Sequence, residues 1–144
     1  MECDEVSAPR LLLDTHIWLW YAIGDERLGV ASRARTQDEI DADGVTVSAM
    51  SAWEVLMHWS EGRVRLSKPP EAWVLAALSV PQIAVAPVTS EIAAAAALLP
   101  GEAPADPADR MLAATARQDD LVLATRDREL LAYGDAGHVA VMPA

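Results

Sequence analysis

Five short apolar runs recur along the chain, each bounded by polar, glycine or proline residues. A run of a few residues is typical of a strand that is buried on both faces of a sheet, because a buried helix needs a longer apolar segment. We expect strands at residues 10–13, 45–48, 83–86, 121–124 and 138–142.

The segments between these runs carry helical signals. Ile17, Trp20 and Tyr21 follow the first run at helical spacing. Asp106-Pro107 combines a favoured N-cap residue with proline at the first helical position, and Gly62 lies where a C-terminal cap is expected. We expect helices over about residues 17–24, 31–40, 52–60, 70–80, 90–100, 107–118 and 128–132.

The alternation of strands and helices predicts the fold class. Parallel strands joined by right-handed helical crossovers have helices on both faces of their sheet. We therefore expect an α/β protein, a three-layer α/β/α sandwich with a mainly parallel central sheet. A length of 144 residues, of which 52% are hydrophobic, suits one core, so residues 1–144 are expected to form a single domain. Such folds bind ligands beyond the carboxyl ends of their strands.

Charge and composition exclude several classes of protein. The formal net charge of −11 has the wrong sign for holding nucleic acid by bulk electrostatic attraction. Cys3 is the only cysteine, which excludes an internal disulfide, and no Cys/His pairing suggests zinc. The N-terminus Met1–Glu5 is acidic, unlike a signal peptide, and no apolar segment approaches the roughly 18 residues of a membrane-spanning helix. We expect a cytoplasmic protein without a membrane segment.

Four acidic residues occupy the positions where such a fold builds its sites. Two follow expected strands and two lie in the first turns of expected helices, and the topology brings several of these positions to one edge of the sheet. These residues are Asp14, Glu54, Asp109 and Asp127.

Each acid taken alone also has an ordinary structural explanation. The two that follow strands occupy N-cap positions. Glu54 is three residues after Ser51, the spacing of a capping box, and Asp109 is three residues after Asp106, where an acid complements the helix dipole. Together, however, four acids at one edge would repel one another unless cations lie among them.

The chemistry of such a cluster is that of a hard cation. Mg²⁺ and Mn²⁺ prefer oxygen ligands, keep several waters and leave room for a substrate phosphate. A cation in this position can activate water, orient an in-line attack on phosphorus and stabilise the leaving oxygen. Phosphodiester hydrolysis is the reaction class that follows.

Four stretches of the sequence resemble the successive motifs of PIN-domain toxins of the VapC type, in the right order and over most of the chain. They are Leu11-Leu12-Leu13-Asp14-Thr15-His16, Val47-Ser48-Ala49-Met50-Ser51-Ala52-Trp53-Glu54, Asp106-Pro107-Ala108-Asp109-Arg110-Met111-Leu112-Ala113 and Leu123-Ala124-Thr125-Arg126-Asp127. Relatives of this subgroup commonly have a His and a basic residue before the Asp-Pro pair, where this chain has Pro104-Ala105, and often a large apolar residue in place of Ala108.

The resemblance implies a metal-dependent endoribonuclease, the toxin of a type II toxin–antitoxin pair. It implies RNA as substrate, a homodimer, and inhibition by a VapB-like antitoxin. It also implies that the four acids hold Mg²⁺, or Mn²⁺, with Thr125 and Ser51 as nearby hydroxyl groups that bind the substrate. We further hypothesise that the partner lays an apolar segment in a groove and places a basic side chain among the acids.

Other residues have a functional and a structural interpretation. Arg110 and three neighbouring arginines can hold RNA phosphates or form surface ion pairs. For His16 and for the five tryptophans we favour packing, and for Asp106 we favour the N-cap role. The three further arginines are Arg117, Arg126 and Arg128.

Two other functions compete with the ribonuclease. A phosphoacceptor regulatory domain also uses acids at strand ends, but it needs a lysine after a late strand, and the only lysine is Lys68 in a proline-rich loop. An inactive binding module would keep the fold without the chemistry. DNA remains an alternative substrate, because metal–carboxylate chemistry does not distinguish the sugar.

Overall fold

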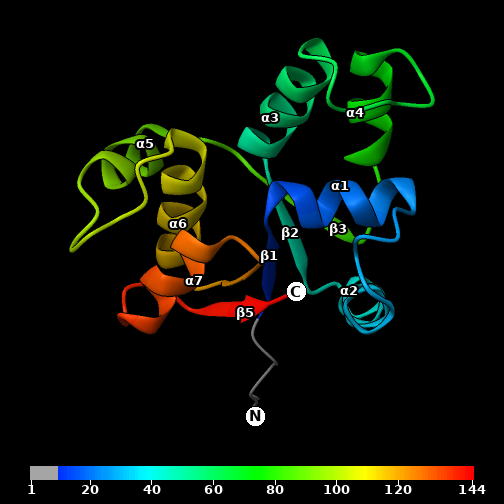
Figure 1. Ribbon diagram of the computed structural model, residues 1–144. Helices are drawn as coiled ribbons and strands as arrows, with labels where there is room; N and C mark the ends of the chain where they lie inside the picture. Colours follow the sequence, from blue (N-terminus) through cyan, green and yellow to red (C-terminus); the bar gives the residue numbers. More distant parts are fainter. Residues whose placement is uncertain (1–9) are drawn as a thin grey trace.

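A computed structural model describes residues 10–144, whose five strands form one sheet in the order β3-β2-β1-β4-β5 (Figure 1). Every pairing is parallel. The predicted α/β fold with a parallel central sheet is confirmed. The strands are β1 (Leu11–Leu13), β2 (Val45–Ser48), β3 (Ile83–Ala86), β4 (Val122–Thr125) and β5 (Val141–Pro143).

Seven helices connect and cover these strands within the described residues, each at a position that the sequence predicted. Helix α3 begins three residues earlier than expected because the Ser48 hydroxyl caps it by accepting from Met50 N. Helix α7 extends three residues further than expected, to Asp135. The helices are α1 (Thr15–Ile23), α2 (Val30–Asp41), α3 (Ala49–Ser60), α4 (Pro70–Ala77), α5 (Ser90–Ala97), α6 (Pro107–Asp119) and α7 (Arg128–Asp135).

The alternating side chains of β1 divide the core into two layers. Leu11 and Leu13 belong to a cluster with residues of α1, α2, α3 and α4, whereas Leu12 packs with residues of α6 and α7 on the other face. Figure 1 shows α6 and α7 on one side of the sheet and α1 and α2 on the other. Helices therefore cover both faces of the sheet, and the three-layer α/β/α sandwich is confirmed. Helix α5 packs against α6.

The register of the sheet places three strand ends side by side. Leu13 at the end of β1 pairs with Val47 of β2 and with Ala124 of β4. The residues that follow these three paired positions therefore lie beside one another at the carboxyl edge of the sheet. Among them are Asp14 and Thr125, two of the predicted site residues.

No helix within residues 10–144 is long and apolar enough to cross a membrane. Cys3 and the acidic segment Met1–Glu5 lie outside the described residues.

Candidate active site

The four predicted acids line one cavity of about 520 Å³ at the carboxyl edge of the sheet. Asp14 lies between β1 and α1, Asp127 between β4 and α7, and Asp109 in the first turn of α6. Glu54 lies in the second turn of α3, not in the first as predicted, because Ser48 starts that helix early. Four elements that are distant in sequence thus contribute one carboxylate each.

Two of these acids are both helix caps and members of the cavity. Asp14 Oδ1 accepts from Thr15 N at 2.7 Å, and Asp127 Oδ1 accepts from the backbone N–H groups of Glu129 and Leu130 at 2.9 and 3.0 Å. The capping interpretation of Asp14 and Asp127 is therefore confirmed without excluding a site. A cap engages one carboxylate oxygen and orients the other.

The capping-box explanation of Glu54 is wrong, because Ser48 and not Ser51 caps α3. Asp106 has the predicted N-cap role, accepting from Asp109 N at 3.0 Å. Its side chain also lines the cavity, so a fifth carboxylate lies close to the four predicted ones.

Burial and mutual repulsion raise the pKa values of three of the acids. The pKa of Asp109 rises to about 8, first through desolvation and then through the charges of the other carboxylates. Burial also raises the pKa of Glu54 and that of Asp14, although hydrogen bonds from Thr15 and Thr125 oppose the rise. The cluster therefore binds protons or cations more readily than isolated carboxylates do.

Two buried threonines orient these acids. Thr125, fully buried, donates to Asp14 Oδ2 at 2.6 Å and accepts from Asp127 N at 3.0 Å. Thr15 donates to Glu54 Oε1 at 2.5 Å. Thr15 was not predicted as a site residue, although its place directly after Asp14 in the first motif was the available signal. Together the threonines link β1, α3 and β4 around the cavity.

Two predicted substrate-binding residues have other contacts. Ser51 is fully buried, and its hydroxyl oxygen lies 2.8 Å from Thr15 Oγ1. The Arg110 guanidinium donates to the backbone oxygens of Ala96, Pro104 and Ala97 at 2.9, 3.0 and 3.2 Å, and so fastens the end of α5 to α6. Neither lines the cavity, so we interpret both as structural.

Aromatic and basic side chains also line the cavity, together with Ile17 and Glu129. His16 lies between Trp20 and His58, with ring centroids 5.6 and 5.3 Å away. His58 Nε2 is buried and has no hydrogen-bond partner within residues 10–144. Trp20 is 9% exposed, and Arg126 lies over its ring. The predicted packing role of His16 is wrong in part, because its ring contacts Trp20 and His58 but the residue is exposed and lines the cavity.

The donor set fits a hard cation. The cavity offers carboxylate oxygens from several elements, the rings of His16 and His58, and no thiolate, and a set dominated by carboxylates favours Mg²⁺ or Mn²⁺. Within residues 10–144 no three acidic, His or Cys side chains are grouped tightly enough to enclose a metal by themselves. Mg²⁺ keeps several waters in protein sites, so water or phosphate oxygens would complete the shell of an ion held by these acids.

Comparison with known proteins identifies the family. Residues 11–136 match the PIN domain family. The chain is 31% identical to Ribonuclease VapC22 of Mycobacterium tuberculosis (strain ATCC 25618 / H37Rv) over 123 residues, which are 85% of this chain and 91% of that protein. The chain belongs to the PIN domain family.

Solved structures with the same fold include VapBC and FitAB complexes. A chain of the DNA-bound VapBC complex from Salmonella typhimurium superposes with a TM-score of 0.63 at 17% identity, covering 94% of this chain and 98% of that one. A chain of the DNA-bound VapBC2 complex from Rickettsia felis gives 0.62 at 10% identity, covering 92% and 97%. FitAcB from Neisseria gonorrhoeae gives 0.57 at 24% identity, covering 92% and 96%.

Family membership removes the phosphoacceptor alternative. Lys68, the lysine that it needed, lines a different cavity, between α1, α2 and α4.

Proposed function

We propose that this chain is a VapC-type toxin, a cytoplasmic endoribonuclease that hydrolyses RNA phosphodiester bonds with Mg²⁺ held by Asp14, Glu54, Asp109 and Asp127. The observation that carries the proposal is the convergence of these four acids on one cavity. The choice of RNA rests on the similarity to Ribonuclease VapC22. Mn²⁺ has the same ligand preference and is expected to substitute.

Hydrogen bonds from neighbouring residues hold and orient the carboxylates that are proposed to bind the metal. Thr125 and Thr15 N fix the two oxygens of Asp14, and Thr15 Oγ1 fixes one oxygen of Glu54. Asp127 is held by its cap hydrogen bonds. When bound, Mg²⁺ lowers the pKa of a coordinated water and stabilises negative charge on the phosphate. Residues with fixed rotamers lose little entropy on binding the ion, which favours affinity.

The direct test is a cleavage assay with purified protein and two oligonucleotides of the same sequence, one RNA and one DNA. We expect RNA cleavage with Mg²⁺ or Mn²⁺, none in excess EDTA, and none by Asp14→Asn. Asp38→Asn is the matched control, because Asp38 is exposed on α2. Cleavage that persists in EDTA would refute the metal mechanism. A folded protein that cleaves neither oligonucleotide would favour the inactive binding module.

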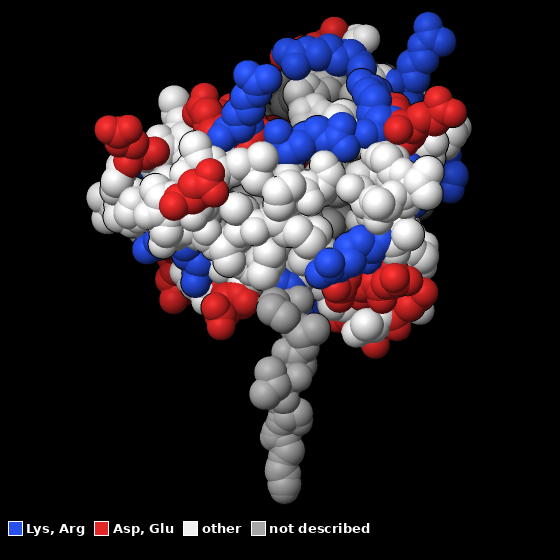
Figure 2. All heavy atoms as spheres, turned by 60° about the horizontal axis from the view of Figure 1, so that its bottom comes forward, with Lys and Arg blue, Asp and Glu red and all other residues white. Residues whose placement is uncertain are grey.

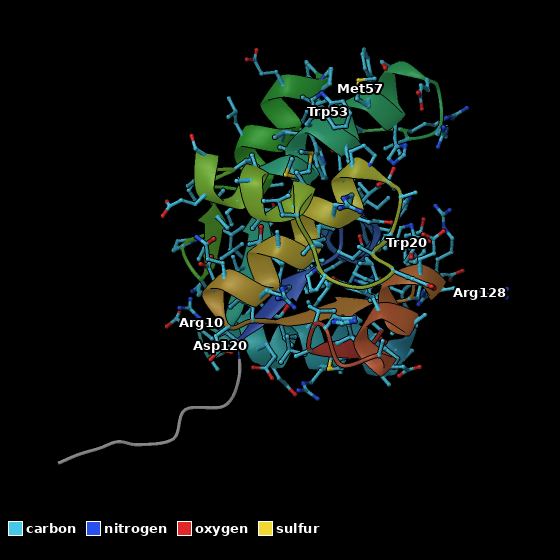
Figure 3. All side chains as sticks on the ribbon, turned by 90° about the vertical axis from the view of Figure 1, so that its left-hand side faces the viewer. Arg10, Trp20, Trp53, Met57, Asp120 and Arg128 are labelled. Atoms are coloured by element: carbon cyan, nitrogen blue, oxygen red, sulfur yellow. The ribbon has the colours of Figure 1, made fainter. Side chains whose placement is uncertain are left out.

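A homodimer is the second part of the proposal. Trp53 and Met57, one turn apart on α3, are 56% and 39% exposed (Figure 3). Large apolar side chains that are exposed together are typical of interaction surfaces. We expect light scattering to give a dimer mass for the natural chain and a monomer mass for the Trp53→Ser/Met57→Ser variant. Leu98→Ser, which changes a residue that is 81% exposed at the end of α5, is the control. An unchanged dimer in the double variant would place the interface elsewhere.

Inhibition by a VapB-like antitoxin is the third part, supported by the toxin–antitoxin complexes among the structures of the same fold. A groove of about 1120 Å³ between α1, α2 and α4 is lined by apolar side chains such as Trp18, Trp73 and Val80. An apolar antitoxin segment fits this groove, and a basic antitoxin side chain among the acids would compete with Mg²⁺. We expect inhibition by the cognate antitoxin to weaken as Mg²⁺ rises. Inhibition that is independent of both Mg²⁺ and every basic residue of the segment would indicate simple steric blocking.

A further inference from the structure

Arg126 is the only Lys or Arg among the described residues that line the acid cavity. It lies between Thr125 and Asp127, so β4 delivers a guanidinium to the same edge as the carboxylates. A cavity walled by acids repels the phosphates of RNA, and the chain as a whole carries a net charge of −11. A positively charged side chain at this cavity can therefore offset the repulsion between the acids and the RNA phosphates.

Two contacts hold the Arg126 side chain. Its guanidinium carbon lies 4.8 Å from the centroid of the Trp20 ring, and Nε donates to the backbone oxygen of Ala144 at 3.1 Å. Trp20 itself is almost fully buried in α1, so the ring is a fixed platform. Arg27, paired with Asp25 at 2.7 Å, lies 5.1 Å from the centroid of the same ring.

These contacts leave the terminal nitrogens of Arg126 available for an anion. Within residues 10–144, no Asp or Glu side chain forms an ion pair with Arg126, although several acids line the same cavity. No hydrogen bond of its two terminal nitrogens is found there either. An exposed arginine beside acids ordinarily forms an ion pair with one of them. Here the contacts with the Trp20 ring and with Ala144 hold the Arg126 side chain instead.

Three arginines that do not line the cavity have no such freedom. Arg33 donates to three backbone oxygens between α1 and α2, Arg110 donates to three around α5, and Arg117 donates to the His138 backbone oxygen. Figure 2 shows Lys and Arg side chains gathered around a hollow on the face that it presents. Arg126 differs from the three arginines named above in lining the acid cavity itself.

We propose that Arg126 binds a phosphate of the RNA strand at the edge of the acid cavity and that Trp20 is its positioning residue. The proposal rests on the proposed ribonuclease function. A guanidinium presents a planar pair of N–H donors that matches two phosphate oxygens, and holding it on an aromatic ring reduces the entropy lost on binding. A phosphate bound there would be adjacent to the carboxylates that hold the metal.

The first test separates binding from chemistry. Arg126→Gln is expected to raise KM for RNA about tenfold or more, the range for loss of a charge-assisted hydrogen bond, and to change kcat little. Arg128→Gln is the matched control, because Arg128 is exposed, begins α7 and does not line the cavity (Figure 3). The control should keep the KM of the natural chain. An unchanged KM in Arg126→Gln, or a loss confined to kcat, would overturn the proposal.

The second test has a readout that a structural role would not move. RNA binding is measured against salt concentration in the inactive Asp109→Asn background, with and without Arg126→Gln. Removing one phosphate contact from a single strand should reduce the slope of log K against log salt by about 0.7. Arg126→Lys should restore most of the slope while KM stays raised, because lysine keeps the charge and loses the planar fork.

Trp20→Leu tests the platform. It should raise KM while keeping the salt slope, and its effect should disappear in the Arg126→Gln background, because the two residues act through one contact. Additive effects would refute the positioning role. Melting curves show whether the Trp20→Leu variant still folds. If it does not fold, the comparison of Arg126→Lys with Arg126→Gln alone tests the phosphate contact.

Failure of this proposal and failure of the proposed function give different results. If the natural chain does not cleave RNA, the ribonuclease proposal fails, but the salt slope still shows whether Arg126 contacts phosphate. If the natural chain cleaves RNA and Arg126→Gln has the same KM and slope, only the Arg126 proposal fails.

Discussion

Asp109→Asn is expected to stabilise the metal-free protein at neutral to alkaline pH. The half-buried Asp109 carboxyl has a pKa of about 8 in the folded protein, against 3.8 without its surroundings. The folded state therefore binds its proton more tightly than the unfolded state does. The stability linked to this group is complete below pH 3.8 and is lost as pH rises towards about 8. An asparagine at this position does not ionise and avoids that loss.

The magnitude follows from the pKa difference. Converted in full, a change from 3.8 to about 8 corresponds to about 5–6 kcal/mol. Asp109 is partly exposed, so solvent and salt screen its repulsion from the other acids. We therefore expect a gain of about 1–2 kcal/mol above pH 8 and a rise in melting temperature of about 2–8 °C for a chain of this size.

The assay is thermal unfolding in EDTA between pH 4 and pH 9, for the natural chain, Asp109→Asn and the exposed control Asp38→Asn. The difference between Asp109→Asn and the natural chain should grow from pH 4 to about 8 and then level off, while Asp38→Asn should show little change. Saturating Mg²⁺ should stabilise the natural chain more than Asp109→Asn, because binding to the folded state adds to its stability.

The alternative role of Asp109 predicts the opposite sign. If this acid only complements the dipole of α6, its neutralisation should cost about 0.3–1 kcal/mol. A less stable Asp109→Asn variant, with a deficit that grows as pH rises, would refute the repulsion argument.

Two further predictions concern the support of the site and of the sheet edge. Thr125→Val removes the hydrogen bond that lowers the pKa of Asp14, so the acid limb of the pH–activity profile should move to higher pH and activity should fall about 10–100-fold. Thr125→Ser keeps the hydroxyl and should retain the pH profile and the activity of the natural chain. An unmoved acid limb in the valine variant would contradict this role. Gly134→Ala should lower the free energy of unfolding by about 1–3 kcal/mol in denaturant, because the new methyl group would overlap Val141 of β5. Val141→Ala in the same chain should recover part of the loss. An unchanged free energy of unfolding in Gly134→Ala would show that β5 moves freely.

The positions of the strands and helices were predictable because their signals are local. Short apolar runs, the Asp106-Pro107 start of α6 and the glycine after α3 act within a few residues of where they occur. The parallel order of the sheet followed from the alternation of strands and helices, since crossovers are right-handed. The four acids were predictable for the same reason, because each lies close to the end of a strand or the start of a helix.

The contacts among these residues depended on packing between segments far apart in sequence. Thr125 and Asp14 are 111 residues apart, and Thr15 and Glu54 are 39 apart, so neither hydrogen bond has a local signal. The start of α3 moved because Ser48 at the end of β2 took the cap in place of Ser51.

Tertiary structure also decided which polar residues face the cavity. Ser51 and Arg110 occur in motifs beside the acids, yet one is buried under Thr15 and the other binds backbone oxygens of α5 and the following loop. Arg126, equivalent to Arg110 by sequence alone, lies on Trp20 at the cavity wall. Sequence determines the charge of a side chain and the element that carries it, whereas the direction of a long arginine depends on which rings and carbonyl groups the folded chain brings within its reach.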